Sequence, residues 1–146
     1  MSSRPSSPDL FLLFNHRLTA AQEADARVSL GIGRIIAPSE ALQRRWSEVP
    51  PETDELAAWL VPLFAWLVQA GRPGDLILIQ GEFGATFLAV QEAFRLGLIP
   101  VYSTTRRQAV EEYQADGSVH LRHVFFHVRY RRYSLIGGAW FRRERR

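Results

Sequence analysis

The segment from Asp75 to Tyr102 constrains the fold of this chain more than any other. Residues 75–80 form a continuous apolar run of strand length, residues 86–96 have helical periodicity, and residues 98–102 form a second short apolar run. A strand, a helix and a strand in this order make a unit whose two strands lie parallel in one sheet. The sequence therefore predicts an α/β fold, in which ligands bind outside the carboxyl ends of the strands.

Further elements precede this unit. Residues 9–14 are another apolar run, typical of a strand buried on both faces, and residues 34–37 predict a short strand. Between them, Thr19 and Gln22 have the spacing of a capping box, which predicts a helix that ends at Gly31. We expect this helix to turn Ala24, Val28 and Leu30 toward the core.

Two more helices are predicted before residue 75. Ser39 can cap a helix that Pro50 and Pro51 end, and Thr53 opens a longer helix that Pro62 bends.

After residue 102 the apolar pattern changes from a helical to a strand-like period. Residues 108–114 and 119–130 flank Asp116-Gly117, which is a strong signal for a β-hairpin. The order of elements predicts a Rossmann-like three-layer domain, with a mainly parallel central sheet and a C-terminal antiparallel hairpin. We expect one domain over residues 9–136, a disordered lead-in over residues 1–8 and a basic tail over residues 137–146.

Composition limits the chemistry. The chain of 146 residues has no cysteine, so thiol chemistry and thiolate metal sites are excluded. No apolar stretch approaches the length of a membrane span, and we expect a cytoplasmic protein that binds no membrane. The net charge is +3, and all 18 basic residues are arginine, so any cationic contact to a phosphate must come from a guanidinium.

Three segments follow predicted strands and are candidate ligand loops. Residues 81–86 form a turn bracketed by Gly81 and Gly84, which would bring free N–H groups close to an anion; a tight strand-to-helix turn explains the same glycines. Residues 103–107 offer hydroxyl and guanidinium groups for phosphate or ribose, although a solvated loop has the same composition. Asn15-His16 could contact a ribose or transfer protons, or simply bond locally.

Three further patterns have plainer explanations. His123 and His127 have the spacing of a helical zinc pair, but in a strand they would lie about 13 Å apart. Arg122 and His127 match the Arg-x4-His of helical HEPN ribonucleases, yet a strand would turn them to opposite faces. Arginines and tyrosines alternate over residues 129–133, as on nucleic-acid surfaces, but charge that protects an edge strand explains them equally well.

Four blocks of sequence together resemble a known family. They are LLFNHRLTAAQEADA at residues 12–26, LQRRW at 42–46 with Pro50-Pro51, QGEFGAT at 80–86, and GLIPVYSTTRR at 97–107. These blocks look like the CRISPR-associated Csx-type family numbered twenty, which accompanies type III CRISPR systems. That family resembles CARF domains and is grouped with the ring nucleases, which linearise cyclic tetra-adenylate.

The resemblance implies a function and a site. The expected protein is a CARF-like homodimer that cleaves cyclic tetra-adenylate and so switches off type III CRISPR signalling, without metal or cofactor. It would not bind a long nucleic acid. The implied catalytic residues are His16 for proton transfer, Thr105 or its neighbour Thr104 to orient the attacking ribose, and Arg106 or Arg107 to stabilise the charged phosphorane. The ligand-binding residues would be Asn15, Gln80, Gly81, Phe83, Gly84, Ala85, Thr86, Ser103 and Thr104.

Two alternatives remain open from sequence. A non-catalytic sensor or sponge would bind the cyclic oligoadenylate without cutting it, and an adaptor would bind a partner protein through Trp140 and the arginine tail.

Overall fold

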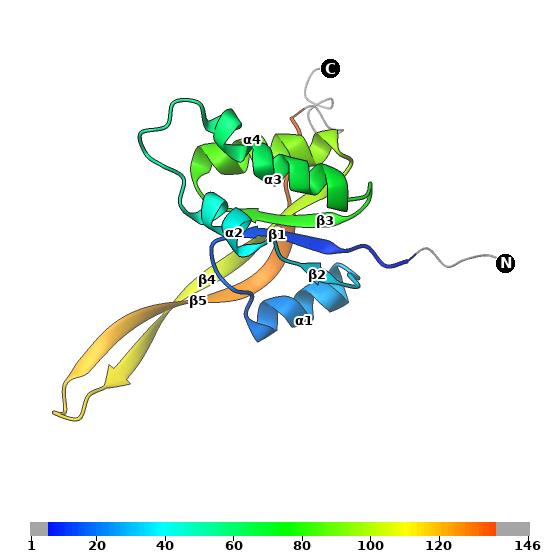
Figure 1. The fold of residues 1–146 in the computed structure, drawn as a ribbon. Coiled ribbons are helices and arrows are strands. Elements are labelled where there is room, and N and C mark those ends of the chain that lie inside the picture. The colour runs from blue at the N-terminus through cyan, green and yellow to red at the C-terminus, as the bar shows by residue number, and fades with distance from the viewer. Residues whose placement is uncertain (1–5, 137–146) are drawn as a thin grey trace, which may run out of the picture.

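Residues 6–136 are described by the computed structural model, which has a five-stranded sheet in the order β2-β1-β3-β4-β5. The sheet is parallel from β2 to the start of β4, and β5 pairs antiparallel with β4. The predicted fold class is confirmed (Figure 1). The elements are β1 (Leu10–Phe14), α1 (Ala20–Ser29), β2 (Ile35–Ile36), α2 (Glu40–Ser47), α3 (Leu56–Ala70), β3 (Leu76–Gln80), α4 (Phe83–Arg95), β4 (Ile99–Tyr113) and β5 (Val119–Arg132).

Helices cover both faces of the sheet because β1 and β3 are apolar on both sides. On one face, Phe11 and Ile77 pack with Trp46 of α2, Leu63 of α3 and Ala89 of α4. On the other face, a second cluster joins the opposite side of the strands to α1. Its buried members are Leu10, Phe14, Ala26, Ile32, Leu76, Leu78, Val101 and Tyr130.

Local sequence signals account for the ends of the first two helices. The capping box of α1 is confirmed: Thr19 Oγ1 accepts from the Gln22 amide, and Gln22 Oε1 accepts from the Thr19 amide. Ser39 Oγ caps α2 by accepting from the Leu42 amide. The longer helix, α3, begins at Leu56 rather than at Thr53, and Pro62 lies inside it.

The inward face of α1 differs from the prediction. Leu30 is partly buried against the second cluster, as expected, but Val28 is 85% exposed and Ala24 is exposed, whereas Gln22 and Ala26 are buried. The helix therefore turns a polar side chain, Gln22, toward the sheet. A hydrophobicity pattern misses this face because one of its two buried residues is an amide that finds hydrogen-bond partners inside the protein.

The predicted loop over residues 103–107 is wrong, because these residues belong to β4. Only Ile99, Pro100 and Val101 of β4 pair with β3, but pairing with β5 continues from Val101 to Tyr113. The backbone N–H and C=O groups of residues 103–107 therefore have hydrogen-bond partners in β5. Their polar side chains are compatible with a strand that leaves the sheet. The hairpin at Asp116-Gly117 is confirmed, with Gly117 at φ 85°.

The expected termini are only partly described. Residues 6–8 have no regular secondary structure, and the Pro8 carbonyl accepts a hydrogen bond from the Gly33 amide at 2.8 Å. Residues 1–5 and the predicted basic tail 137–146 lie outside the described residues. Over residues 6–136, no helix combines the length and apolarity needed to cross a membrane.

Candidate functional site

A cavity of about 560 Å³ lies at the carboxyl ends of β1 and β3, beside the point where β4 leaves the sheet. This is the edge at which parallel α/β sheets bind ligands. Four of the sequence-predicted site residues line it: His16, Gln80, Ser103 and Thr105. The other lining residues are Phe14, Arg17, Thr19, Ala21, Gln22, Phe125, Phe126 and His127.

Two further hollows, lined by other predicted site residues, flank this cavity. Asn15 lines a neighbouring hollow of about 510 Å³, which shares His16 and Arg17 with the main cavity. On the other side, Gln80 is shared with a hollow of about 260 Å³ lined also by Gly81, Phe83, Thr86, Tyr102 and Tyr133. Both neighbouring hollows thus share lining residues with the main cavity.

The turn after β3 does not offer the free N–H groups that were expected. The helix begins at Phe83, three residues earlier than Thr86, and the Glu82 carboxylate accepts from the amides of Gly84 at 3.0 Å and Ala85 at 2.8 Å. A carboxylate that caps a helix N-terminus satisfies the donors that an anion would otherwise use. The phosphate-cradle interpretation of Gly81–Thr86 is therefore wrong for these two amides.

The two glycines of this turn are explained by packing. A Cβ at Gly81 would lie 2.8 Å from the Trp46 indole, and a Cβ at Gly84 would lie 2.8 Å from Leu56 Cδ2. Neither glycine has a positive φ. The tight-turn alternative, with close packing against α2 and α3, accounts for both positions.

The remaining predicted residues lie on β4 outside the cavity wall. Thr104 faces away from it, with Oγ1 donating to the Arg129 carbonyl at 2.9 Å. Arg106 and Arg107 are exposed, opposite Phe126 and Phe125 of β5. Because strand side chains alternate, Arg107 shares the face of Thr105 and Arg106 lies on the other face.

A hydrogen-bonded network that sequence reasoning missed lies in the cavity wall. His127 Nδ1 lies 2.6 Å from Ser103 Oγ, and its Nε2 lies 2.6 Å from Asp25 Oδ2. Gln22 Nε2 donates to the same Ser103 hydroxyl at 3.3 Å, and the Ser103 amide donates to Gln80 Oε1 at 2.8 Å. This hydrogen-bonded network takes at least one side chain from each of β3, β4, β5 and α1.

The protonation states of Asp25 and His127 follow from the donors and acceptors in this hydrogen-bonded network. Hydrogen bonds from Ser29 and His127 hold the pKa of Asp25 below its usual value, so Asp25 is an ionised acceptor at neutral pH. In a neutral His127 ring, Nε2 therefore carries the proton and Nδ1 accepts from the Ser103 hydroxyl. An imidazole held in this way is a base directed at a serine oxygen.

No local spacing could have revealed this arrangement. Asp25 is 102 residues from His127 in the chain, and Ser103 is 24 residues from it. Both rejected His127 motifs stay rejected, because His127 lies in the strand β5. Among residues 6–136, no group of three or more histidine or acidic side chains is arranged to hold a metal ion.

The fold and the cavity define a Rossmann-like α/β protein with a histidine-containing pocket at the carboxyl edge of its sheet. The chain belongs to the family described as "Uncharacterized protein MJ1673 family", which it matches over residues 8–131. It is 42% identical over 127 residues to "Uncharacterized protein MJ1673" of Methanocaldococcus jannaschii, and the match covers 87% of this chain and 98% of that relative. No solved structure matches the chain.

Proposed function

We propose that this protein is a cytoplasmic, metal-independent ring nuclease that cleaves cyclic tetra-adenylate and thereby ends type III CRISPR signalling. The observation that carries the proposal is the cavity in which His16, Gln80, Ser103 and Thr105 converge beside the His127–Asp25 pair. Three of the sequence segments implied by the family resemblance contribute to this one cavity.

The walls of the cavity suit an adenylate. Phe125 and Phe126 offer aromatic side chains, which are 63% and 47% exposed and can stack on a base. Arg17 lines the cavity, and Arg107 lies two residues beyond Thr105 on the same strand face. In the proposal Arg17 and Arg107 bind phosphate oxygens, while Arg106, on the opposite face, does not.

The proposed reaction is an attack by a ribose 2′-hydroxyl on its adjacent phosphorus. The proton of that hydroxyl passes to Ser103 Oγ while the Ser103 proton passes to His127 Nδ1, and Asp25 stabilises the imidazolium that forms. The bond from phosphorus to the 5′-oxygen breaks, and His16 protonates that oxygen. The products are a 2′,3′-cyclic phosphate and a 5′-hydroxyl.

The test is incubation with cyclic tetra-adenylate, with and without a chelator. We expect linear products ending in 2′,3′-cyclic phosphate under both conditions. His127→Ala should lower kcat by about 10²- to 10⁴-fold, the usual contribution of a general base. His120→Ala, an exposed position of the same strand on the opposite face of the hairpin, is the matched control and should leave kcat unchanged.

Arginine variants separate binding from chemistry. Arg107→Ala should weaken cleavage and Arg106→Ala should not. Binding without products would indicate a sensor or sponge, and neither binding nor products would leave a partner-binding adaptor.

One observation favours a second candidate, a serine hydrolase. Ser103, His127 and Asp25 are linked in the order of a nucleophile, a base and an orienting carboxylate, and the Gln22 amide lies beside the Ser103 oxygen. In this scheme Ser103 Oγ attacks an ester carbonyl, its proton passes through His127 to the leaving alcohol, and water then releases the acid. A fluorophosphonate that labels wild type but not Ser103→Ala, with no cleavage of cyclic tetra-adenylate, would favour this candidate.

A further inference from the structure

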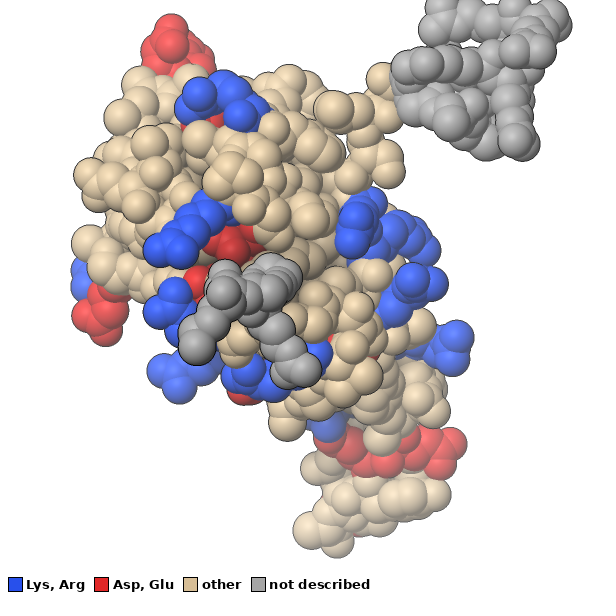
Figure 2. Space-filling view, turned by 90° about the vertical axis from the view of Figure 1, so that its right-hand side faces the viewer, with Lys and Arg blue, Asp and Glu red and all other residues tan. Residues whose placement is uncertain are grey.

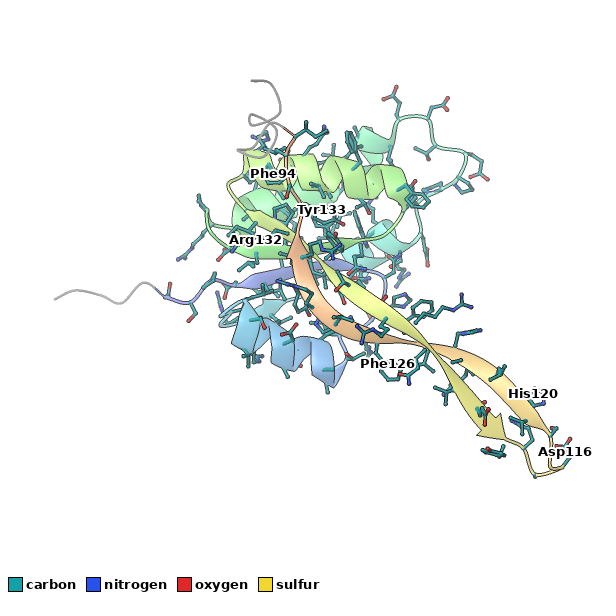
Figure 3. All side chains as sticks on the ribbon, turned by 180° about the vertical axis from the view of Figure 1, so that it is seen from behind. Phe94, Asp116, His120, Phe126, Arg132 and Tyr133 are labelled. Atoms are coloured by element: carbon teal, nitrogen blue, oxygen red, sulfur yellow. The ribbon has the colours of Figure 1, made fainter. Side chains whose placement is uncertain are left out.

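The β4–β5 hairpin extends well beyond the rest of the fold (Figure 1). We call its projecting part, residues 105–127, the arm. Figure 3 shows His120 and Asp116 at its far end, Phe126 nearer the body, and Tyr133 within the body. Pairing of β4 with β3 stops at Val101, so the arm is a ribbon of two strands only. An isolated two-stranded ribbon is at best marginally stable in water.

One face of the arm, here called the apolar face, carries large apolar side chains in three of its five cross-strand pairs, beside Arg107, Glu111 and His123. Tyr113 pairs with Val119, Leu121 lies opposite Glu111, and Phe125 lies opposite Arg107. Strand alternation places all of these side chains on the face that also carries Thr105 and His127. The exposed fractions are 77% for Tyr113, 49% for Val119, 68% for Leu121 and 63% for Phe125. This apolar face begins in the cavity and continues to the end of the arm.

Charge is divided along the same ribbon. Its basic half, nearest the body, carries Arg106 and Arg107, while Glu111, Glu112 and Asp116 lie toward the end, where Arg122 pairs with Glu112 at 2.9 Å. Figure 2 shows blue side chains along the part of the arm nearer the body and red ones farther out. A second arm laid antiparallel on the first would therefore place the acidic end of each against the basic half of the other.

We infer that the arm is the contact surface of a two-fold dimer, in which two copies of this chain lay the apolar faces of their arms together, antiparallel. A two-fold contact is self-complementary, so one surface must satisfy both partners. The axis passes near the Ala109–His123 pair, where Ala109 is small and the His123 side chains of the two copies face each other. About that axis, Glu111 of one copy meets Arg107 of the other.

This geometry also completes the cavity. The same axis brings Tyr113 and Val119 of each copy onto Thr105 and His127 of the other, which line the cavity. The partner's arm end thus adds a wall to the cavity beside Thr105 and His127. A single-stranded nucleic acid is the other occupant that arginine and phenylalanine side chains would suit, but the acidic end of the arm repels phosphates.

The test measures the mass of the full chain by light scattering after gel filtration, without nucleotide. Wild type should have twice the 16.7 kDa of the chain. Leu121→Glu, on the apolar face, should be monomeric, whereas Gln108→Glu, on the opposite face of the arm, should stay dimeric. Circular dichroism checks that each variant is folded.

Charge reversal keeps the test decisive if Leu121→Glu does not fold. Glu111→Arg and Arg107→Glu should each weaken the dimer, and the double variant should restore it, because each arm then presents the opposite charges. A monomeric wild type, a dimer unaffected by all of these changes, or a monomer that binds single-stranded RNA through the arm would overturn the inference. Mass is measured independently of cleavage, so failure of the proposed nuclease activity leaves this result intact.

Discussion

At the scale of single residues, the buried polar side chains carry the distinctive chemistry. The His127 side chain is 5% exposed and bridges β4 to α1 through hydrogen bonds of 2.6 Å on both ring nitrogens. Tyr130, three residues later, donates from its hydroxyl to the Gln22 carbonyl at 2.8 Å. These contacts fix the start of the arm against α1, which holds the cavity wall in place.

Tyr130 gives a prediction about alkaline stability. Burial, together with the nearby Asp25 carboxylate, raises the pKa of Tyr130 from 10.0 to about 12. Because the folded pKa lies above the unfolded one, the contribution is complete below pH 10 and is lost as pH rises toward 12. Tyr130→Phe should reduce the free energy of unfolding by about 1 kcal/mol at neutral pH, through the lost hydrogen bond, and should flatten the decline between pH 10 and pH 12.

Urea unfolding over this pH range measures the effect. Tyr102→Phe is the matched control, because Tyr102 lies outside the arm and its hydroxyl accepts a hydrogen bond from the exposed Arg131 side chain. Equal slopes for the two variants would contradict the prediction.

Gly81 tests whether the turn after β3 is shaped by packing. Gly81→Ala should lower the free energy of unfolding by about 1–3 kcal/mol, because the added methyl group would meet the Trp46 indole. Gly33→Ala, on an exposed loop where the nearest atom is 3.3 Å away, should change stability little. Thermal unfolding of both variants gives the comparison, and an unaffected Gly81→Ala would show that the close contact is not limiting.

At the scale of elements, two segments differ from what their sequences indicate: the turn after β3 and residues 103–107 of β4. Gly81-Glu82-Phe83-Gly84 looks like an open, glycine-bracketed turn, but Glu82 closes it by capping α4. Ser103-Thr-Thr-Arg-Arg107 looks like a loop because it has no apolar alternation, but β5 extends it as a strand. In both places a contact made elsewhere in the structure overrides the local composition.

The Glu82 cap gives an element-scale prediction. Glu82→Ala should cost about 1 kcal/mol of stability, since the amides of Gly84 and Ala85 lose their acceptor. Inorganic phosphate should then raise the melting temperature of Glu82→Ala more than that of wild type, because the freed amides can bind an anion. Glu52→Ala, an exposed loop position before α3, is the control, and equal phosphate effects in all three proteins would contradict this prediction.

At the scale of the whole molecule, the arm makes stability depend on association. If two copies stabilise each other's arms, folding is linked to dimerisation, and the melting temperature of wild type should rise with protein concentration. Leu121→Glu should show no such dependence. Differential scanning fluorimetry over a wide concentration range distinguishes the two, and a concentration-independent wild type would argue against the dimer.

Local signals in the sequence were enough to predict most of the fold. The apolar runs of β1 and β3, the Thr19–Gln22 capping box, the Ser39 cap and the Asp116-Gly117 turn all act over a few residues, and each is present as expected. Element ends were less predictable: α4 begins at Phe83 because Glu82 caps it, whereas α3 begins at Leu56 without a side-chain cap. The inward face of α1 was missed because a buried amide carries no hydrophobic signal.

The sequence by itself determined the α/β class and the order of helices and strands along the chain. It also determined the sheet edge at which His16, Gln80, Ser103 and Thr105 gather. Only the tertiary structure decided that Asp25 and His127 meet Ser103 in the same cavity, and that the residues after Ser103 leave the sheet as part of a ribbon. The physical reason is the separation along the sequence over which each kind of interaction acts. Caps, turns and apolar periodicity are set by neighbours along the chain, whereas a hydrogen bond between residues 102 positions apart exists only once the sheet and α1 have packed together.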